Sequence, residues 1–511
     1  MSSAAEITGR QRAAITVSTI LATLIYSLDT TIANIALPHI QASVAASQDQ
    51  IIWVLTSYIV ASAIMTPASG FFAGRFGLKR IYLFSVSGFV FASMLCGIAQ
   101  SLAQIVVFRA LQGICGAALV PLSQAVLMST YPKERQGGAM ALYAVAVMVG
   151  PVLGPILGGW LSENYSWRYV FYINIPIGAL AFLGLSTFLA ERPKNATAKL
   201  DWFGFGSLGV AIAAFQLLLD RGEQLDWFSS GEIAIEAIVA ASALYMFIVH
   251  TLTSEAPFLR PQLLRDRNFI AGLLFNVILG LTYYASLALL PTYLQHLMNY
   301  PVVTAGLTLG PQGMGSMAAM LVAGRLVGRV DTRILLAIGL GLAAYAFHET
   351  TLWTPDVAQT TVMRVGVIQG ASIGFLFVPL SVVTLSTLPP NLLADGAGFS
   401  TLVRNIASGA GISIVTALLT RNTQQNHAEI ATYVTQVNRM FETDAVSHIL
   451  NPMSLAGRAA LDAMITREAQ IIAYIDDYKL LLIATLAVVP LLLVFRPARK
   501  DAAKQADGAH L

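Results

Sequence analysis

The run AAITVSTILATLIYSLDTTIANIAL, residues 13–37, contains a single charged side chain, Asp29. A stretch of about 20 apolar residues is what an α-helix needs to cross the hydrocarbon core of a bilayer. A carboxylate near the centre of such a helix costs roughly 3 kcal/mol on insertion. The stretch therefore predicts a membrane-spanning helix, and Asp29 is the first candidate for a functional residue.

Composition leads to the same class of protein over the whole chain. Of 511 residues, 56% are hydrophobic and 11% are charged, whereas a soluble domain carries about 25% charged residues. The net charge of +3 comes from basic residues scattered between apolar blocks, which argues against a nucleic-acid partner. Cys96 and Cys115 lie in apolar segments, so no disulfide framework is expected. The first apolar block is too long for a cleavable signal peptide.

The apolar blocks predict an all-α polytopic membrane protein with fourteen transmembrane helices. The candidate spans lie near 13–37, 51–72, 81–100, 103–128, 137–161, 169–190, 202–219, 232–250, 269–291, 302–325, 334–353, 361–387, 396–420 and 479–495. Glycines interrupt the seventh of these spans, which is the weakest helix of the set.

The distribution of Lys and Arg predicts the orientation of these spans. If the N-terminus is cytoplasmic, twenty Lys and Arg residues fall on the cytoplasmic side, and the short outside loops hold only Arg168 and Arg221. Positive charge is retained on the cytoplasmic side of membrane proteins. Both termini are then cytoplasmic, and residues 421–478 form one long polar outside loop with some helical pattern around 455–475.

An internal repeat divides the chain into two related halves. Gln112-Gly113, followed by Val-Pro-Leu-Ser at 120–123, recurs 257 to 258 residues later as Gln369-Gly370 and Val-Pro-Leu-Ser at 378–381. Paired six-helix repeats are typical of transporters, with substrate sites between the halves. The predicted parts are a cytoplasmic N-terminus (1–12), an N-terminal six-helix bundle (13–190), a linker with an inserted helix pair (191–268), a C-terminal six-helix bundle (269–495) that includes the periplasmic loop 421–478, and a cytoplasmic tail (496–511).

Asp29 and Arg109 are the strongest candidates for proton coupling. Both are costly inside a membrane helix, and at ~1.5 Å per residue both lie ~9–12 Å below the outer boundary, so they can approach each other. Burial raises the pKa of a carboxyl and a nearby Arg lowers it, so separating the two would change the proton affinity of Asp29. Gln112 lies one turn from Arg109 on the same face. A structural hydrogen-bonding role for Asp29 and a static ion pair are the alternatives.

Two glycine-containing segments are candidates for packing and gating. In GPVLGPILGG, residues 150–159, glycines recur at every fourth position, which allows close helix approach in lipid, and prolines bend the helix. The segment 70–80 between the second and third spans carries basic residues that either anchor helix ends or close the cytoplasmic face. The candidates are Gly70, Arg75, Lys79, Gly150, Pro151, Gly154, Pro155, Gly158 and Gly159.

Aromatic and polar residues in the spans are candidates for lining a substrate cavity. Aromatic faces suit lipophilic or cationic ligands, and Arg404 is an intramembrane cation that suits anionic ligands or helix ends, with snorkelling as the alternative. The cavity candidates are Tyr26, Asn34, Tyr58, Gln124, Tyr143, Asn276, Tyr283, Tyr284 and Arg404; each is also a possible packing residue. No nucleotide-binding Gly-rich loop, metal motif or cofactor motif is present, so neither ATP nor a metal is expected to drive the protein.

These motifs resemble the major facilitator superfamily, and more closely its fourteen-helix drug:proton antiporters of the EmrB/QacA type. The resemblance rests on the runs 28–38, 109–113, 150–159 and 167–178, and it covers nearly the whole chain. It implies a secondary transporter rather than an enzyme, with Asp29 at the acidic position of the helix-1 motif.

The EmrB branch is the most similar, through the segment 219–230 and the loop 421–478. That branch implies a periplasmic adaptor (EmrA-like) and an outer-membrane channel (TolC-like) as partners in a tripartite pump. One departure is Gly74, where the family's loop motif usually carries Asp, so the charge relay of that motif is not expected here in its usual form.

The expected function is a proton-coupled exporter of small lipophilic or amphipathic compounds in the bacterial inner membrane. Protons entering from outside would protonate Asp29 while substrate leaves the cavity, and the glycine stripe would let the halves move. One rival is an exporter of the same fold for a specific metabolite, siderophore or lipid. A second rival is a membrane protein that docks an adaptor or senses a ligand without transporting it.

Overall fold

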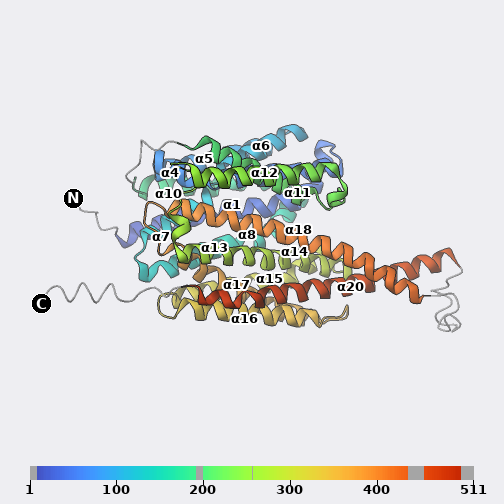
Figure 1. The fold of residues 1–511 in the computed structure, drawn as a ribbon. Helices are drawn as coiled ribbons and strands as arrows, with labels where there is room; N and C mark the ends of the chain where they lie inside the picture. The colour runs from blue at the N-terminus through green and yellow to red at the C-terminus, as the bar shows by residue number, and fades with distance from the viewer. Residues whose placement is uncertain (1–7, 192–199, 256, 435–453, 496–511) are drawn as a thin grey trace.

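The computed structural model describes residues 8–191, 200–255, 257–434 and 454–495, and these are helical with no β-strand. The helices run side by side along one common direction, and the described chain begins and ends at the same end of the bundle (Figure 1). Eleven helices are long and apolar enough to cross a membrane within the described residues, or twelve if one bent pair forms a single span. The expectation of an all-α polytopic fold is confirmed.

The N-terminal half contains six spans, three of them built from two helical pieces. The pieces are α1 (Gly9–Val44), the short α2 (Gln48–Ile51), α3 (Trp53–Met65) with α4 (Ala68–Phe76), α5 (Leu78–Ile98), α6 (Leu102–Gly116) with α7 (Leu119–Thr130), α8 (Gln136–Asn164), and α9 (Tyr169–Tyr172) with α10 (Asn174–Phe188).

The inserted pair and the C-terminal half follow. The pair is α11 (Trp202–Arg221) and α12 (Gly231–Thr253). The C-terminal half comprises α13 (Arg267–Leu279), the π-helical η4 (Gly280–Tyr284), α14 (Ala285–Thr292), the π-helical η5 (Tyr293–Leu297), α15 (Val302–Leu326), α16 (Thr332–Thr351), α17 (Gln359–Leu385), α18 (Leu393–Tyr433), α20 (Leu455–Ala487) and the 3₁₀ turn η7 (Val489–Leu493).

Each of the fourteen predicted spans coincides with one of these helices or helix pairs. Twelve of them satisfy the length and apolar content of a membrane span, and α15 and α20, the tenth and fourteenth spans, are not among those twelve. The number of fourteen membrane crossings therefore stays a prediction. The glycines of the seventh span do not interrupt it, since α11 is continuous over 20 residues.

Prolines account for the breaks in two spans. The second span bends by 56° between α3 and α4, at Thr66 and Pro67. The fourth is broken at Ala117 and Ala118, and Pro121 lies four residues after Ala117. Because proline has no backbone N–H and its ring clashes with the carbonyl four residues earlier, a helix bends at this point.

Three predicted span boundaries differ from the helix ends because polar helical turns carry no hydropathy signal. Helix α1 continues past Leu37 to Val44 with Pro38 inside it. Helix α18 continues past residue 420 to Tyr433, and α20 begins at Leu455, so the described part of the predicted loop 421–478 is helical. The two helices pack on each other and extend beyond the bundle (Figure 1). Residues 435–453 lie outside the described residues.

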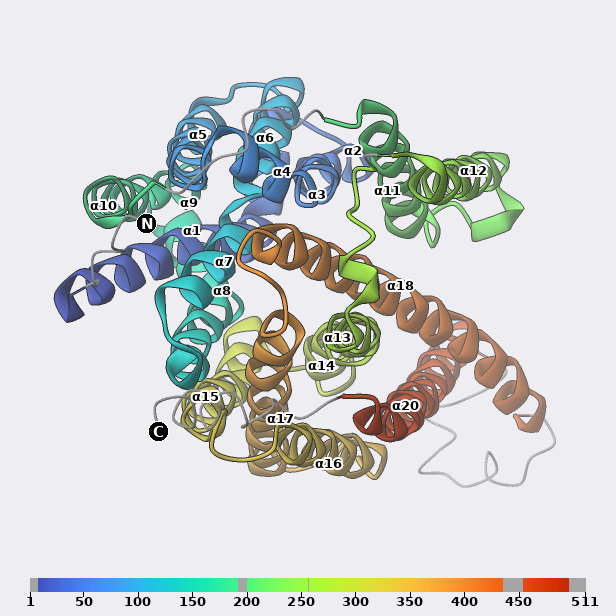
Figure 2. The ribbon, with the colours of Figure 1, turned by 60° about the vertical axis from the view of Figure 1, so that its left-hand side comes forward.

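The two halves meet mainly through α8 and α18. Helix α8 packs on α15 and α17, while α18 packs on α4 and α7 (Figure 2). A Cβ on Gly137 would lie 2.7 Å from the backbone oxygen of Gly324, so the start of α8 and the end of α15 are in backbone contact. These contacts lie at the end where the described chain begins and ends. The halves are therefore closed against each other at that end.

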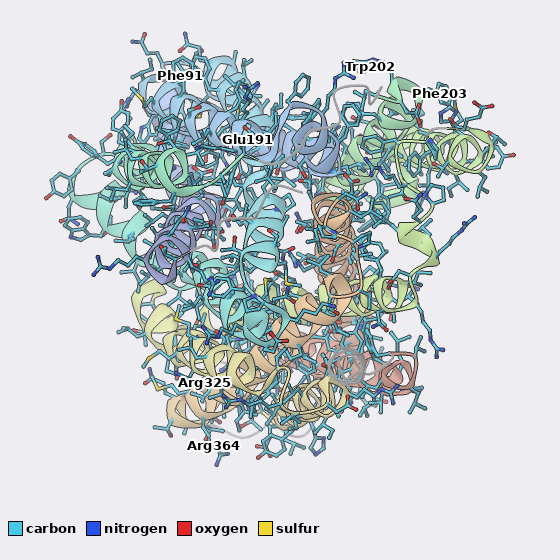
Figure 3. All side chains as sticks on the ribbon, turned by 90° about the vertical axis from the view of Figure 1, so that its left-hand side faces the viewer. Phe91, Glu191, Trp202, Phe203, Arg325 and Arg364 are labelled. Atoms are coloured by element: carbon cyan, nitrogen blue, oxygen red, sulfur yellow. The ribbon has the colours of Figure 1, made fainter. Side chains whose placement is uncertain are left out.

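The inserted pair packs on the outside of the bundle, across the line where α3 and α18 face each other. Helix α11 contacts both of them. Thr56 of α3 donates a hydrogen bond to Asp220 at 3.1 Å, and Ser413 of α18 donates to the Leu219 carbonyl at 3.0 Å. Trp202 and Phe203 are exposed at the outer edge of the pair (Figure 3), as interfacial aromatic residues are in membrane proteins.

Asp201 ties the inserted pair together at the end near the chain termini. Its carboxylate accepts the backbone N–H groups of Gly204 and Phe258 at 2.9 and 3.0 Å, and it lies 2.9 Å from His250 Nε2 of α12. Burial opposes ionisation of this carboxyl, but these hydrogen bonds outweigh it and lower the pKa of Asp201. The charged form therefore holds the start of α11, the end of α12 and the following linker in one place.

Candidate functional site

Asp29 lies at the centre of a buried hydrogen-bond network inside the N-terminal half. Its side chain is fully buried. Arg109 Nη1 donates to Oδ2 at 2.6 Å, and Gln112 Nε2 donates to Oδ1 at 2.8 Å. Asn174 Nδ2 also donates to Oδ1, at 3.1 Å. Three helices, α6, α10 and α1, thus converge on one carboxylate.

Arg109 is buried and has several protein partners besides Asp29. Its Nη1 also donates to Gln112 Oε1 at 2.8 Å, and its Nε donates to the Val54 carbonyl of α3 at 3.2 Å. The guanidinium carbon lies 4.1 Å from the centre of the Tyr58 ring, a cation–π distance. Arg109 and Gln112 reach the same carboxylate because residues three apart share a helix face.

Two members of the network, Asn174 and Ser93, were not among the predicted site residues. Asn174 lies at the first turn of α10 and donates to Ser93 Oγ at 3.0 Å, and Ser93 donates to the Phe171 carbonyl at 2.9 Å. An uncharged polar residue inside an apolar run was the only sequence signal for either. The run 167–178 was recognised as a motif, but no role could be given to Asn174 without its position in space.

The network is electrically balanced only while Asp29 is ionised. Removing one partner of a buried ion pair typically costs 3–5 kcal/mol, because the other charge stays buried without compensation. A proton on Asp29 has the same electrostatic effect as removing the carboxylate, so it weakens the hold on Arg109. The burial of Arg109 therefore depends on the charge of Asp29.

The glycine stripe of α8 packs against α1 beside this network. A Cβ on Gly150 would lie 2.2 Å from the Ser27 carbonyl oxygen, and one on Gly154 would lie 2.2 Å from Thr31 Oγ1. Gly158 faces Ile32, while no atom lies within 4 Å of a Cβ built on Gly159. The stripe thus joins two helices of the same half, whereas other residues of α8, among them Gly137 and Val152, contact the other half. Pro151 is exposed, and Pro155 lies within α8.

The segment 70–80 contacts the other half through Gly70 and not through its basic residues. A Cβ on Gly70 would lie 2.5 Å from the backbone nitrogen of Asp395, at the start of α18. Lys79 donates to the Ser186 carbonyl at 2.6 Å within its own half, and Arg75 lies over the Phe76 ring. Asp395 forms an ion pair with Arg260 at 3.4 Å. An acid of the opposite half thus lies beside Gly70, whereas no atom lies within 4 Å of a Cβ built on Gly74.

Three of the predicted cavity residues, Tyr26, Tyr143 and Arg404, lie where the two halves face each other, and Tyr58 lies beside Tyr26. The Tyr26 and Tyr58 rings are 6.2 Å apart, and Tyr143 of α8 stacks on Phe377 of α17 at 6.4 Å. The Arg404 guanidinium lies 5.1 Å from the same Phe377 ring. Aromatic side chains from both halves thus surround a buried cation.

Arg404 is unusual because it forms no ion pair with any described residue. Its side chain is buried, and its Nε has no hydrogen-bond acceptor. It interacts electrostatically with Tyr26 and Tyr143 across the line between the halves. Buried charges in proteins are ordinarily paired or hydrogen-bonded, so this cation is a candidate ligand-binding group.

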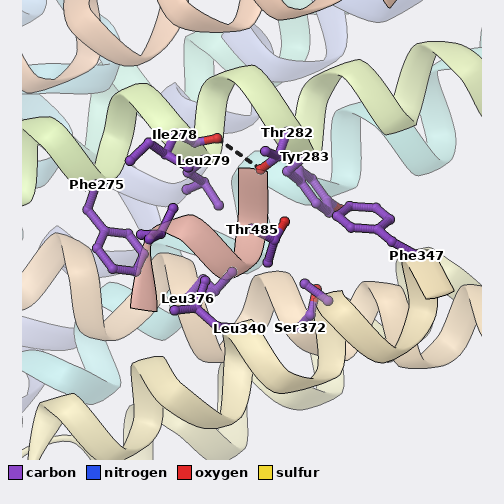
Figure 4. A pocket seen from close by; sticks show the side chains of 12 residues that line it. Phe275, Ile278, Leu279, Thr282, Tyr283, Leu340, Phe347, Ser372, Leu376 and Thr485 are labelled. Carbon is purple, nitrogen blue, oxygen red and sulfur yellow. Dashed lines mark hydrogen bonds between the residues drawn. The ribbon is translucent and has the colours of Figure 1, made fainter. Parts of the chain in front are cut away.

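Of the remaining cavity candidates, Tyr284 interacts electrostatically with Tyr26 and Tyr143 across the line between the halves, as Arg404 does, and the others lie in other surroundings. Asn276 is buried and joins α13 to α18 through Ser400 Oγ at 3.2 Å. Gln124 is buried in α7, whereas Asn34 is exposed on α1. Tyr283 and Tyr284 meet edge to face at 5.7 Å. Tyr283 also lines a small pocket inside the C-terminal half, among α13, α16, α17 and α20 (Figure 4), rather than between the halves.

This fold, with paired bundles, a site inside one bundle and contacts at one end, is that of a secondary transporter. Solved structures share it: the human organic anion transporter MFSD10 (TM-score 0.59, 14% identity, covering 93% of this chain and 99% of that chain) and the proton:xylose symporter XylE (TM-score 0.56, 14% identity, 92% and 96%). At that identity the likeness concerns the fold alone.

Sequence comparison places the chain more narrowly. The model of the Major Facilitator Superfamily matches residues 19–412. Multidrug export protein EmrB of Escherichia coli strain K12 is 36% identical over 432 residues, 84% of each chain, and Fatty acid resistance protein FarB of Neisseria gonorrhoeae is 38% identical over 429 residues, again 84% of each. The chain belongs to the major facilitator superfamily, in its EmrB branch. It is a multi-pass membrane transporter and not an enzyme.

Proposed function

We propose that this transporter is a proton-coupled antiporter that exports lipophilic and amphipathic compounds across the bacterial inner membrane. The observation that carries the proposal is the buried pair of Asp29 and Arg109 at 2.6 Å, sealed from water within one half. Multidrug export by the EmrB relatives supports the substrate class. A buried acid that faces a fixed cation supports the proton as the driving ion.

Protonation of Asp29 would act on the substrate cavity through Arg109 and Tyr58. The Arg109 guanidinium lies over the Tyr58 ring, and Tyr58 lies beside Tyr26 at the line between the halves. When a proton neutralises Asp29, Arg109 keeps Gln112, Val54 and the Tyr58 ring as partners and loses its counter-charge. The cation then shifts toward its remaining partners, and the movement reaches the cavity through Tyr58.

Orientation and partners complete the proposal. With the chain termini in the cytoplasm, the halves are closed on the cytoplasmic side, as required of a state that releases substrate outward. The helical extensions of α18 and α20 then project into the periplasm. We assign to them the docking of a periplasmic adaptor that leads to an outer-membrane channel. The similarity to EmrB-branch proteins supports this assignment.

Reconstitution of the purified protein tests this function directly. In liposomes with a pH gradient and a lipophilic fluorescent dye, we expect dye movement against proton movement, abolished when an ionophore collapses the gradient. Proton-independent transport, or dye binding with no flux, would contradict antiport.

Arg404 favours a second candidate function, the export of anionic lipophiles such as fatty acids. An unpaired buried guanidinium beside Phe377 and Tyr143 provides one charge for a carboxylate and aromatic faces for an apolar tail. FarB, named for fatty acid resistance, is among the relatives. Charge-assisted hydrogen bonds contribute about 1.5–3 kcal/mol, enough to decide between anionic and neutral substrates.

The Arg404→Gln variant is expected to lose transport of a fluorescent fatty acid about tenfold or more, while transport of a neutral dye stays within about twofold. Each 1.4 kcal/mol corresponds to a tenfold change. Arg364→Gln is the matched control, because Arg364 is exposed at the perimeter of the bundle (Figure 3). Equal losses for the fatty acid and the neutral dye would show that Arg404 has only a structural role.

A further inference from the structure

The C-terminal half repeats the geometry of the Asp29 site without its charges. Gln369 and Ser286 follow Gln112 and Asp29 by the same 257 residues. Gln369 Nε2 donates to Ser286 Oγ at 2.6 Å, as Gln112 Nε2 donates to Asp29 Oδ1 at 2.8 Å. The position that corresponds to Arg109 is Gly366. The second half therefore keeps the amide and replaces the ion pair by a neutral hydroxyl.

A buried acid lies on another helix of the C-terminal half. Asp477 of α20 is almost completely buried, and neither of its carboxylate oxygens has a hydrogen-bond partner among the described residues. Helix α20 packs on α14, η4 and α16, as α10 packs on α1 and α5 in the first half. The first half thus has an acid on α1 and an amide, Asn174, on α10; the second has a hydroxyl on α14 and an acid on α20.

Among the described residues, the other buried acid and two half-buried ones have partners, which sets Asp477 apart. The pairs are Asp29 with Arg109 at 2.6 Å, Asp220 with Thr56 at 3.1 Å, and Asp395 with Arg260 at 3.4 Å. An ionised carboxylate without a partner is very costly to bury, and such a group binds a proton instead.

The groups around Asp477 give it no positive counter-charge. On α20 itself the nearby groups are Asp476, Tyr474 and Tyr478, and η5 contributes Tyr293, whose ring lies 5.4 Å from that of Tyr474. Lys479 is directed elsewhere, since it pairs with Asp476 at 3.1 Å and both side chains are largely exposed. Arg467 of α20 donates to the Leu297 carbonyl at 3.4 Å and acts on Tyr293. His296 of η5, His348 of α16 and Arg421 of α18 are exposed.

Asp477 also lies in line with the pocket of the C-terminal half. Leu481 and Thr485 follow Asp477 by one and two helical turns and are buried on the same side of α20. Thr485 lines the pocket together with Thr282, Phe347 and Leu376 (Figure 4). Asp477 and the hydroxyl groups of this pocket therefore place polar groups along the interior of the C-terminal half.

We propose that Asp477 is a second proton-binding site, located in the C-terminal half. It carries a proton in the conformation described here, in which the two halves are closed against each other at the end of the bundle where the described chain begins and ends. The role of this proton in transport rests on the proposed antiport. Proton binding itself does not, so it can be measured without any substrate.

Infrared spectroscopy of the purified full-length protein in lipid, followed as a function of pH, tests the site. We expect a carbonyl band of a protonated, buried carboxyl at neutral pH in the wild type. Asp477→Asn should lose this band, whereas the neighbouring Asp476→Asn should retain it. Because asparagine resembles the neutral acid, Asp477→Asn should also keep the wild-type melting temperature; Asp477→Ser is the second variant if the first does not fold.

A band that persists in both Asp477 variants would overturn the proposal. The proposal would also be overturned if the wild type had only one band and Asp29→Asn removed it. Transport measurements address the role of the proton separately. If antiport operates, Asp477→Asn should move one proton fewer per dye molecule. Absence of antiport in the wild type would refute the proposed function while the infrared result still decides the site.

Discussion

The Asp29→Asn variant is expected to lose proton-driven export down to the level of empty liposomes while still inserting into the membrane. Asparagine keeps one acceptor oxygen for the hydrogen bonds from Gln112 and Asn174, but it carries no charge and binds no proton. Arg109 is left as a buried cation without compensation, which costs about 3–5 kcal/mol of stability. The variant therefore loses both the proton-binding group and the charge interaction with Arg109 that the proton would switch off.

Two measurements separate the loss of coupling from simple unfolding. Exchange of labelled dye in the absence of a pH gradient should persist in Asp29→Asn, since substrate binding does not need the carboxylate. Adding Arg109→Gln should restore thermal stability, because the uncompensated charge is gone, without restoring proton-driven export; the double-mutant comparison isolates the pair. Full proton-driven export by the single variant would exclude Asp29 as the proton carrier.

The proximity of Asp29 and Arg109 could be predicted from the sequence because it depends on two regular quantities. Helix rise and span boundaries place each charge at a depth, and the two depths matched even though α1 is longer than predicted. Asn174 and Ser93 could not be identified in this way. An uncharged polar side chain costs far less to bury than a charge, so its presence in an apolar run gives little indication of a site.

Contacts between the halves were the least predictable feature. The basic residues of the segment 70–80 suggested a lock, yet the closest approach to α18 is made by Gly70, and the acid there is Asp395. The position of a loop in the sequence does not tell which helix end of the other half it contacts across a pseudo-symmetric interface. The helical extension of α18 was missed for another reason, since hydropathy reports contact with lipid and these turns are polar, whereas the extension of α20 was anticipated only as some helical pattern around 455–475.

Substitution in the glycine stripe should have the second large effect, and it should depend on which glycine is changed. Gly150→Ala and Gly154→Ala place a methyl group 2.2 Å from α1 atoms, so α1 and α8 must move apart. Overpacking of this kind costs about 1–3 kcal/mol. Gly159→Ala meets no atom within 4 Å and should be neutral or slightly stabilising, because alanine favours helix. Melting temperatures of the three variants in the same detergent measure the difference.

The stripe should also control proton coupling, because α1 is held between α8 and the charge network. Thr31, two residues after Asp29, donates to the Gly150 carbonyl at 2.9 Å, while Asp29 itself is directed toward Arg109. Displacing α1 from α8 pushes the carboxylate against its partners and changes a 2.6 Å contact whose strength depends on distance. Gly150→Ala is therefore expected to shift the pH dependence of export relative to Gly159→Ala. Identical pH profiles in these two variants would mean that α8 serves only to pack α1 and has no part in the response to the proton.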